Sequence, residues 1–277
     1  MAARTLRATD VLALVGAFGG PVPVPPPAGR FGRPAVPDDL LPALDALAPA
    51  VRARVLDPLG RHEPPPVQGR PRTLALPAAA GVLAPARQVD ERTCGAAVLA
   101  MLRLAGDPRH ALELSRWPAG AATAFAAQQH ALHARATRTA RGLPAWPAAL
   151  GTPPWGAARV ARYGRVRYTH RVVGGPTAPA VLGAAVEAAA AGVPVPLYTG
   201  GDLAGGVSAA VPRHVVLLTT VRRAVATIYE PSAGRLHAVP VAALVAGRGI
   251  GDDQPLAPAL GGWPHVVWAL LPRDARG

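Results

Sequence analysis

The chain has 277 residues and a formal net charge of +13. Pro and Gly make up about 23% of it, just short of the roughly 25–30% typical of low-complexity disorder. Because half of the residues are hydrophobic and only 16% are charged, the composition excludes a disordered chain and predicts a globular protein with a sizeable core. The length favours one main domain with an extension.

The positive charge does not by itself indicate a nucleic-acid partner. All 29 basic residues are arginines, a usage that together with abundant Ala, Gly and Pro indicates a GC-rich, bacterial genome. The arginines are spread along the chain and form no basic block, so we expect no nucleic-acid binding. A single cysteine excludes an internal disulfide and gives no sign of an oxidising compartment.

Targeting signals are weak. The apolar stretch 11–20 follows Asp10 and lacks a signal-peptide cleavage site, so a short helix beginning near Thr9 or Asp10 is the favoured interpretation. No window reaches the roughly 18–20 apolar residues of a membrane span. We therefore expect a soluble, cytoplasmic protein, with secretion less favoured.

Residues 1–70 are predicted to form a Pro-rich N-terminal extension with short helices. The prolines between 19 and 37 favour extended chain, and the leucine spacing from 40 to 51 favours a short helix. Residues 71–277 then form the main domain, which begins with a possible strand at 73–76.

The main domain shows one strongly predicted helix and one predicted hairpin. Strong helix formers follow Cys94 and stop at Gly106, so a helix begins at or near the cysteine. The β-type runs 214–220 and 224–229 predict an antiparallel hairpin that turns at 221–223. The other expected elements are a helix at 180–191 and strands at 193–198, 235–239 and 266–271.

Cys94 is the candidate nucleophile. The start of a helix concentrates free N–H groups and partial positive charge, which stabilise a thiolate. A thiolate nucleophile needs a His to handle protons, and that His needs an acceptor on its other nitrogen. His214 opens one strand of the predicted hairpin and Glu230 ends the next, so pairing 214 with 230 places both at one end. Gln88 could add an amide donor to an oxyanion hole at the same helix.

The order and spacing of these four residues are similar to the active-site pattern of a known protein family. Gln88 stands six residues before Cys94-Gly, His214 opens a strand, and Glu230, followed by Pro, comes sixteen residues after the His. The pattern resembles the papain-like cysteine peptidases, in particular the double-glycine leader peptidases that process bacteriocins, and their stand-alone relatives. The resemblance implies an α+β, papain-like fold in which the catalytic helix packs on an antiparallel β-sheet. It also implies that Cys94 is the nucleophile, His214 the general base and acid, Glu230 the orienting acid, and Gln88 an oxyanion-hole donor.

The implied activity is that of a thiol hydrolase, a cysteine peptidase or isopeptidase, which acts on a peptide or protein through a thioester without cofactor or metal. The family has Asp or Asn where this chain has Glu230, and residues 117–175 are expected to be an insertion or a substrate lobe. Two alternatives stay open. One is a catalytically inactive peptidase-like binding module, and the other is an acyltransferase of the same fold.

Other residues of interest have less specific interpretations. His130 and His133 are spaced for metal ligation on a helix, but no further ligand completes a set, so no metal site is expected. Trp146, Trp155 and Tyr163 could line a substrate groove, yet we expect them in the core.

Overall fold

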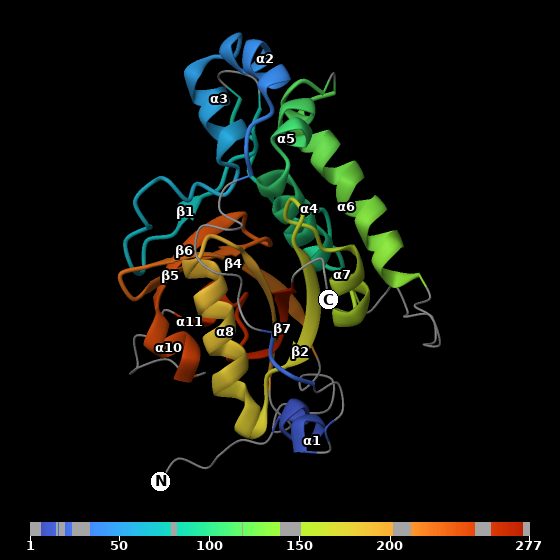
Figure 1. Cartoon of the computed structure of the whole chain (residues 1–277), viewed down its shortest axis with the longest axis vertical. Coiled ribbons are helices and arrows are strands. Elements are labelled where there is room, and N and C mark those ends of the chain that lie inside the picture. The colour runs from blue at the N-terminus through green and yellow to red at the C-terminus, as the bar shows by residue number, and fades with distance from the viewer. Residues whose placement is uncertain are drawn as a thin grey trace.

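An antiparallel β-sheet forms the centre of the computed structural model (Figure 1). Among the residues that the structure describes, seven strands form this sheet, in the order β1-β6-β5-β4-β3-β7-β2. They are β1 (Arg72–Thr73), β2 (Arg167–Val172), β3 (Val195–Gly200), β4 (His214–Arg222), β5 (Val225–Glu230), β6 (Arg235–Pro240) and β7 (His265–Arg273). The structure describes residues 7–14, 16, 20–23, 34–78, 82–117, 119–138, 151–201, 212–246 and 256–273. The protein is thus an α+β protein with an antiparallel sheet, as the sequence predicts.

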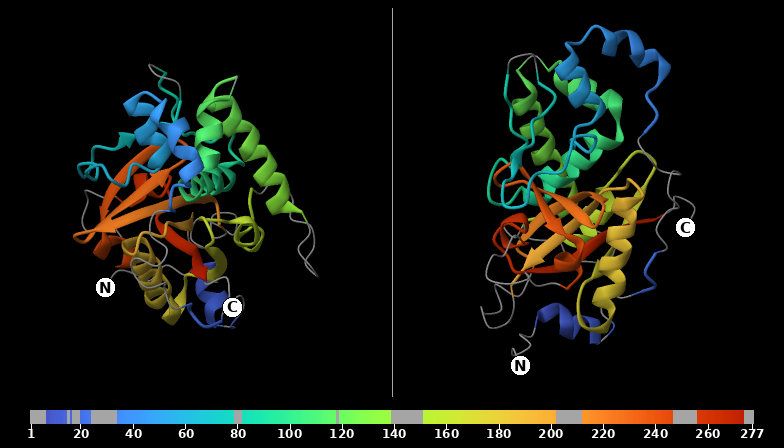
Figure 2. Two further views of the ribbon diagram at one scale, coloured as in Figure 1. Left: turned by 45° about the horizontal axis from the view of Figure 1, so that its top comes forward. Right: turned by 90° about the vertical axis from the view of Figure 1, so that its left-hand side faces the viewer.

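Helices cover both faces of the sheet (Figures 1 and 2). One face carries α4 (Cys94–Gly106), α6 (Ala121–Thr137) and α7 (Pro154–Val160), and the other carries α8 (Ala178–Ala190), α10 (Val241–Ala246) and α11 (Leu256–Ala259). Alternate residues of β4 serve the two layers. Val215 and Leu217 join the hydrophobic cluster of α4, whereas Val216 and Leu218 join that of α8. Both faces of this central strand are therefore buried, which explains its continuous apolar sequence.

The described parts of residues 1–70 pack on the main domain at two separate places. In Figure 1, α1 and the α2–α3 pair lie at opposite ends of the molecule. The Asp10 carboxylate accepts a hydrogen bond from the Gly175 amide at 2.7 Å, while Leu44 and Val55 are buried in the cluster that contains α4. Part of the predicted Pro-rich segment, residues 24–33, lies outside the described residues. The short helices are α1 (Ala8–Leu14), η1 (Asp38–Leu40), α2 (Leu41–Asp45), α3 (Pro49–Leu56), α5 (Pro108–Ser115) and η3 (Gly175–Thr177).

The helix predicted from Cys94 and the antiparallel hairpin predicted after His214 are both confirmed, as α4 and as β4–β5. The turn of the hairpin differs from the prediction. It lies at Arg223 and Ala224, whose φ angles of 48° and 62° suit a two-residue type I′ turn. Within the described ranges, none of the helices combines the length and apolarity needed to cross a membrane.

The register of the hairpin corrects the predicted pairing of 214 with 230. Leu217 lies opposite Tyr229, so continuing the ladder by one residue places Glu230 opposite Val216. The prediction is wrong by two residues. The later turn alone would shift the pairing by three residues, and the β-bulge between Leu218 and Thr220 takes one of them back.

Candidate active site

Cys94 is buried at the first residue of α4, and a folded loop precedes it. The Thr93 hydroxyl accepts hydrogen bonds from the amides of Val89 and Asp90 at 3.1 and 3.0 Å and donates to the Asp90 carbonyl. This side chain therefore closes the loop 89–93 onto the helix. The amides of the first helical turn have no acceptors within the helix, and the helix dipole places partial positive charge there. The predicted position of the candidate nucleophile is confirmed.

Glu230, the last residue of β5, forms a buried hydrogen bond with His214, the first residue of β4. The Nε2 atom of His214 lies 2.8 Å from Oε1 of Glu230, and both side chains are more than 90% buried. The Glu230 carboxylate also accepts hydrogen bonds from the backbone amides of Ser232 and Ala233, at 2.8 and 2.9 Å. Three donors thus fix the orientation of the carboxylate before any substrate binds.

The imidazole of His214 connects this carboxylate to the sulfur. The side chains of His214 and Cys94 line the same small cavity, and the interaction with Cys94 is one of the causes that raise the pKa of His214. Glu230 occupies Nε2 of His214, which leaves Nδ1 as the nitrogen available to the sulfur.

The surroundings of His214 and Glu230 favour the charged form of both side chains. Burial alone lowers the pKa of His214, but the hydrogen bonds to Cys94 and Glu230 outweigh it and raise this pKa to about 9. Burial raises the pKa of Glu230, yet the hydrogen bonds from His214 and the two amides lower it to about 2. At neutral pH His214 and Glu230 are therefore both charged, as an imidazolium and a carboxylate.

The two-residue offset in register explains how a glutamate serves here. Val216, opposite Glu230, lies two residues from His214, so His214 and Glu230 are diagonal neighbours. Because His214 is the first residue of β4, its ring also lines the cavity at Cys94 beyond the end of the strand. Diagonal pairs in a sheet lie about 7–8 Å apart, within reach of long side chains. The extra methylene of Glu230, a departure from the Asp or Asn of the family pattern, spans this diagonal.

Gly261 is a positioning residue that sequence reasoning missed. A Cβ at this position would lie 2.2 Å from Cδ2 and 2.7 Å from Nε2 of His214. The preceding carbonyl, of Leu260, accepts a hydrogen bond from the Thr199 hydroxyl at 2.9 Å, and Thr199 lies opposite His214 in the sheet. The turn after α11 is therefore fixed against the imidazole. Its only signal is the Gly-Gly pair at 261 and 262, which 30 glycines make inconspicuous.

Gln88 takes part in a different set of contacts from those predicted. Its Nε2 atom donates to the Asp90 carbonyl at 2.8 Å, and its Oε1 atom accepts from the Ser232 hydroxyl at 3.1 Å. In this conformation Gln88 links the loop before Cys94 to the turn after Glu230. Its role as an oxyanion-hole donor stays a prediction.

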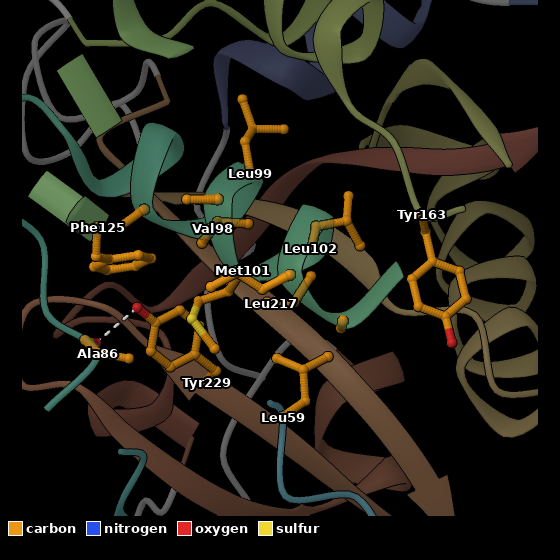
Figure 3. Packing of buried hydrophobic residues seen from close by; sticks show 14 of the residues in the cluster. Leu59, Ala86, Val98, Leu99, Met101, Leu102, Phe125, Tyr163, Leu217 and Tyr229 are labelled. Carbon is orange, nitrogen blue, oxygen red and sulfur yellow. Dashed lines mark hydrogen bonds between the residues drawn. The ribbon is translucent and has the colours of Figure 1, made fainter. Parts of the chain in front are cut away.

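A second glutamine, Gln129 of α6, supports the same loop. It is fully buried, its Oε1 atom accepts from the Val89 amide, and its Nε2 atom donates to the Arg87 carbonyl, both at 3.0 Å. The chain just before this loop is also fixed, because the Ala86 carbonyl accepts a hydrogen bond from the Tyr229 hydroxyl at 2.8 Å (Figure 3). No local sequence signal reveals these contacts, because they join residues far apart in the chain. The segment 117–175 thus contributes part of the scaffold of the site.

A small cavity of about 90 Å³ lies at Cys94. Its lining includes Thr152 and Tyr198, and the Tyr198 hydroxyl donates to the Thr152 carbonyl at 3.0 Å. A Cβ on Gly95 would lie 2.8 Å from Cβ of Thr152, so the glycine after the cysteine permits this close approach. The predicted core position of Tyr163 is confirmed by its burial, whereas Trp146 lies outside the described residues.

Comparison with models of known protein families, with curated proteins and with solved structures finds no match for this chain. Within the part of the chain that the structure describes, no group of three or more ligand side chains could hold a metal ion. The feature that does support a specific chemistry is the arrangement of Cys94 and His214 around one cavity, with His214 hydrogen-bonded to Glu230, which suits nucleophilic catalysis by a cysteine.

Proposed function

We propose that this chain is a thiol hydrolase, a papain-like cysteine peptidase or isopeptidase that acts on a peptide or protein substrate. The observation that carries the proposal is that His214, hydrogen-bonded to Glu230, lines the same cavity as Cys94 at the start of α4. The packing of α4 on β4 of the antiparallel sheet supports the papain-like assignment, as do the sequence motifs.

The reaction proceeds in two steps. The Cys94 thiolate attacks the substrate carbonyl carbon, a carbon–sulfur bond forms, and the amide C–N bond breaks as the proton on His214 passes to the departing amine. A water molecule then attacks the thioester, gives its proton to His214 and releases the carboxylic acid product from the sulfur. The free amides at the start of α4 stabilise the oxyanion in both steps, joined by the Gln88 amide once it leaves the Asp90 carbonyl.

The test is acyl-enzyme formation and turnover on a degenerate mixture of quenched fluorescent peptides. Cys94→Ala and His214→Ala are each expected to abolish turnover, and acid quenching of the wild type should trap a thioester that mass spectrometry places on Cys94. His130→Ala, which replaces an exposed histidine of α6, is the matched control and should keep full activity. Circular dichroism confirms that each variant is folded. Full activity in Cys94→Ala would contradict the proposal.

A second candidate function is a peptide-binding module that performs no turnover. It is favoured by the engagement of the Gln88 amide with the Asp90 carbonyl, which keeps that donor from the oxyanion. This alternative predicts a Cys94 of ordinary reactivity and peptide binding that survives the Cys94→Ala change. The hydrolase proposal predicts a reactive Cys94 whose reactivity depends on His214.

A further inference from the structure

A second, larger cavity lies at the other end of α4. It has a volume of about 470 Å³ and is bounded by the end of α4, by α6 and by the segment that follows α7. The α4 residues that line it, Leu99, Arg103 and Gly106, come five to twelve residues after Cys94, which is about 8–18 Å along the helix axis at 1.5 Å per residue. Its volume falls in the range of roughly 300–1,000 Å³ that small-molecule sites occupy. It is separate from the candidate active site.

Three arginines from three different segments line this cavity: Arg103 of α4, Arg135 of α6 and Arg162 after α7. The lining also contains one carboxylate, Asp107, which accepts a hydrogen bond from the His110 amide. Across the described ranges, no ion pair joins Asp107 or another carboxylate to any of the three arginines. The cavity therefore has an excess of positive charge.

The surroundings of Arg162 strengthen this excess. Its guanidinium donates to the carbonyl oxygens of Arg159 and Ala161, which are neutral acceptors. Burial first, and then the positive charges of Arg167 and Arg135, lower the pKa of Arg162. A bound anion would relieve this mutual repulsion and would place negative charge among the three guanidinium groups.

The wall beside these arginines is built by direct backbone contact. A Cβ on Gly106 would lie 2.3 Å from the Gly164 nitrogen and 2.7 Å from Cα of Tyr163. Tyr163 is fully buried and pairs with Val166 in an isolated bridge, which fixes the turn that carries Gly164. The end of α4 and this turn are thus packed without intervening side chains, so backbone contacts fix this wall of the cavity.

We propose that this cavity binds a small molecule that carries phosphate groups. A guanidinium donates in a planar fork, and one such fork satisfies a planar carboxylate. A tetrahedral phosphate presents oxygens in several directions and can accept from Arg103, Arg135 and Arg162 together. The proposal does not depend on the hydrolase function.

The experiment is isothermal titration of the full chain with pyrophosphate, at an ionic strength held constant with sodium chloride. Saturable one-site binding is expected, and Arg103→Gln, Arg135→Gln and Arg162→Gln should each weaken it by about 10- to 150-fold, the equivalent of the roughly 1.5–3 kcal/mol that a hydrogen bond to a charged group contributes. Arg223→Gln, which removes the same charge at the β4–β5 turn, is the matched control and should leave the affinity unchanged. Citrate at the same ionic strength should bind more weakly.

Arg103 and Arg135 are exposed, so their variants should fold normally, which the thermal unfolding midpoint without ligand will verify. Cys94→Ala should bind pyrophosphate as the wild type does, whatever its effect on turnover. Absence of saturable binding, an equal loss in Arg223→Gln, or citrate binding as tight as pyrophosphate would each overturn the proposal.

Discussion

Glu230 reaches the imidazole of His214 diagonally across the β4–β5 hairpin, two residues out of register, and still places Oε1 2.8 Å from Nε2. Side-chain length at position 230 therefore matters as much as charge. The site is adapted to a glutamate, and the aspartate of the family pattern would be too short.

Glu230→Asp is accordingly expected to lose the contact with His214. The pKa of His214, about 9 in the wild type, should fall towards its ordinary value of 6.5 when the carboxylate withdraws. An NMR titration of the His214 ring measures this change. Glu230→Gln, which keeps the length and removes the charge, should also lower the pKa. An aspartate variant that titrates like the wild type would show that the diagonal geometry is unimportant.

Gly261→Ala is predicted to displace the His214 ring. The new Cβ would lie 2.2 Å from Cδ2, so either the imidazole or the turn must move. We expect the Cys94 alkylation rate at pH 6 to fall at least tenfold. Gly262→Ala is the matched control, because Gly262 has a similar positive φ of 85° but nothing within 4 Å of its Cβ position. Equal effects of the two changes would indicate backbone strain alone and would contradict the assigned contact.

Gln129→Leu should destabilise the protein and loosen the loop before Cys94. It leaves the Arg87 carbonyl without the Gln129 donor, whereas the Val89 amide keeps the Thr93 hydroxyl as an acceptor. Because one unsatisfied group costs about 1–3 kcal/mol, urea unfolding should show a loss of about that size in the free energy of unfolding. Gln128→Leu, at the adjacent residue, is the control, because its Oε1 atom has no hydrogen-bond partner. A smaller loss at 129 than at 128 would refute this role.

The His214–Glu230 pair also predicts how stability depends on pH. The pKa of His214 rises from 6.5 to about 9 on folding, so its contribution is complete below pH 6.5 and is lost as the pH rises through 9. The pKa of Glu230 falls from 4.5 to about 2, so its contribution is complete above pH 4.5 and is lost as the pH falls through 2. The stability difference between the wild type and a His214→Gln/Glu230→Gln variant should peak between pH 4.5 and 6.5. A difference independent of pH would argue against this charged pair.

The sequence was sufficient to predict the local elements that carry the site. Helix formers placed Cys94 at the start of α4, and two β-type runs placed His214 and Glu230 on neighbouring strands. The register could not be predicted, because a β-bulge and the exact position of a two-residue turn leave little trace in composition.

The supporting contacts were also beyond the reach of the sequence. Gln129 and Gly261 act on the site through tertiary packing across 40 or more residues, a distance at which no spacing rule applies. For Gln88 the sequence predicted a hydrogen-bond donor to the oxyanion at Cys94. In the structure its side-chain amide instead donates to the nearby Asp90 carbonyl, a local backbone contact that the spacing of residues does not reveal.

The most direct measurement is the rate of iodoacetamide alkylation of Cys94 as a function of pH, in the wild type and in His214→Ala. Because Cys94 is the sole cysteine, every alkylation event reports on this thiol. The account predicts a rate that stays high well below pH 8 in the wild type and loses this plateau in the variant, as a thiolate paired with an imidazolium requires. A slow rate that follows an ordinary thiol and is unchanged in His214→Ala would contradict the assembled triad.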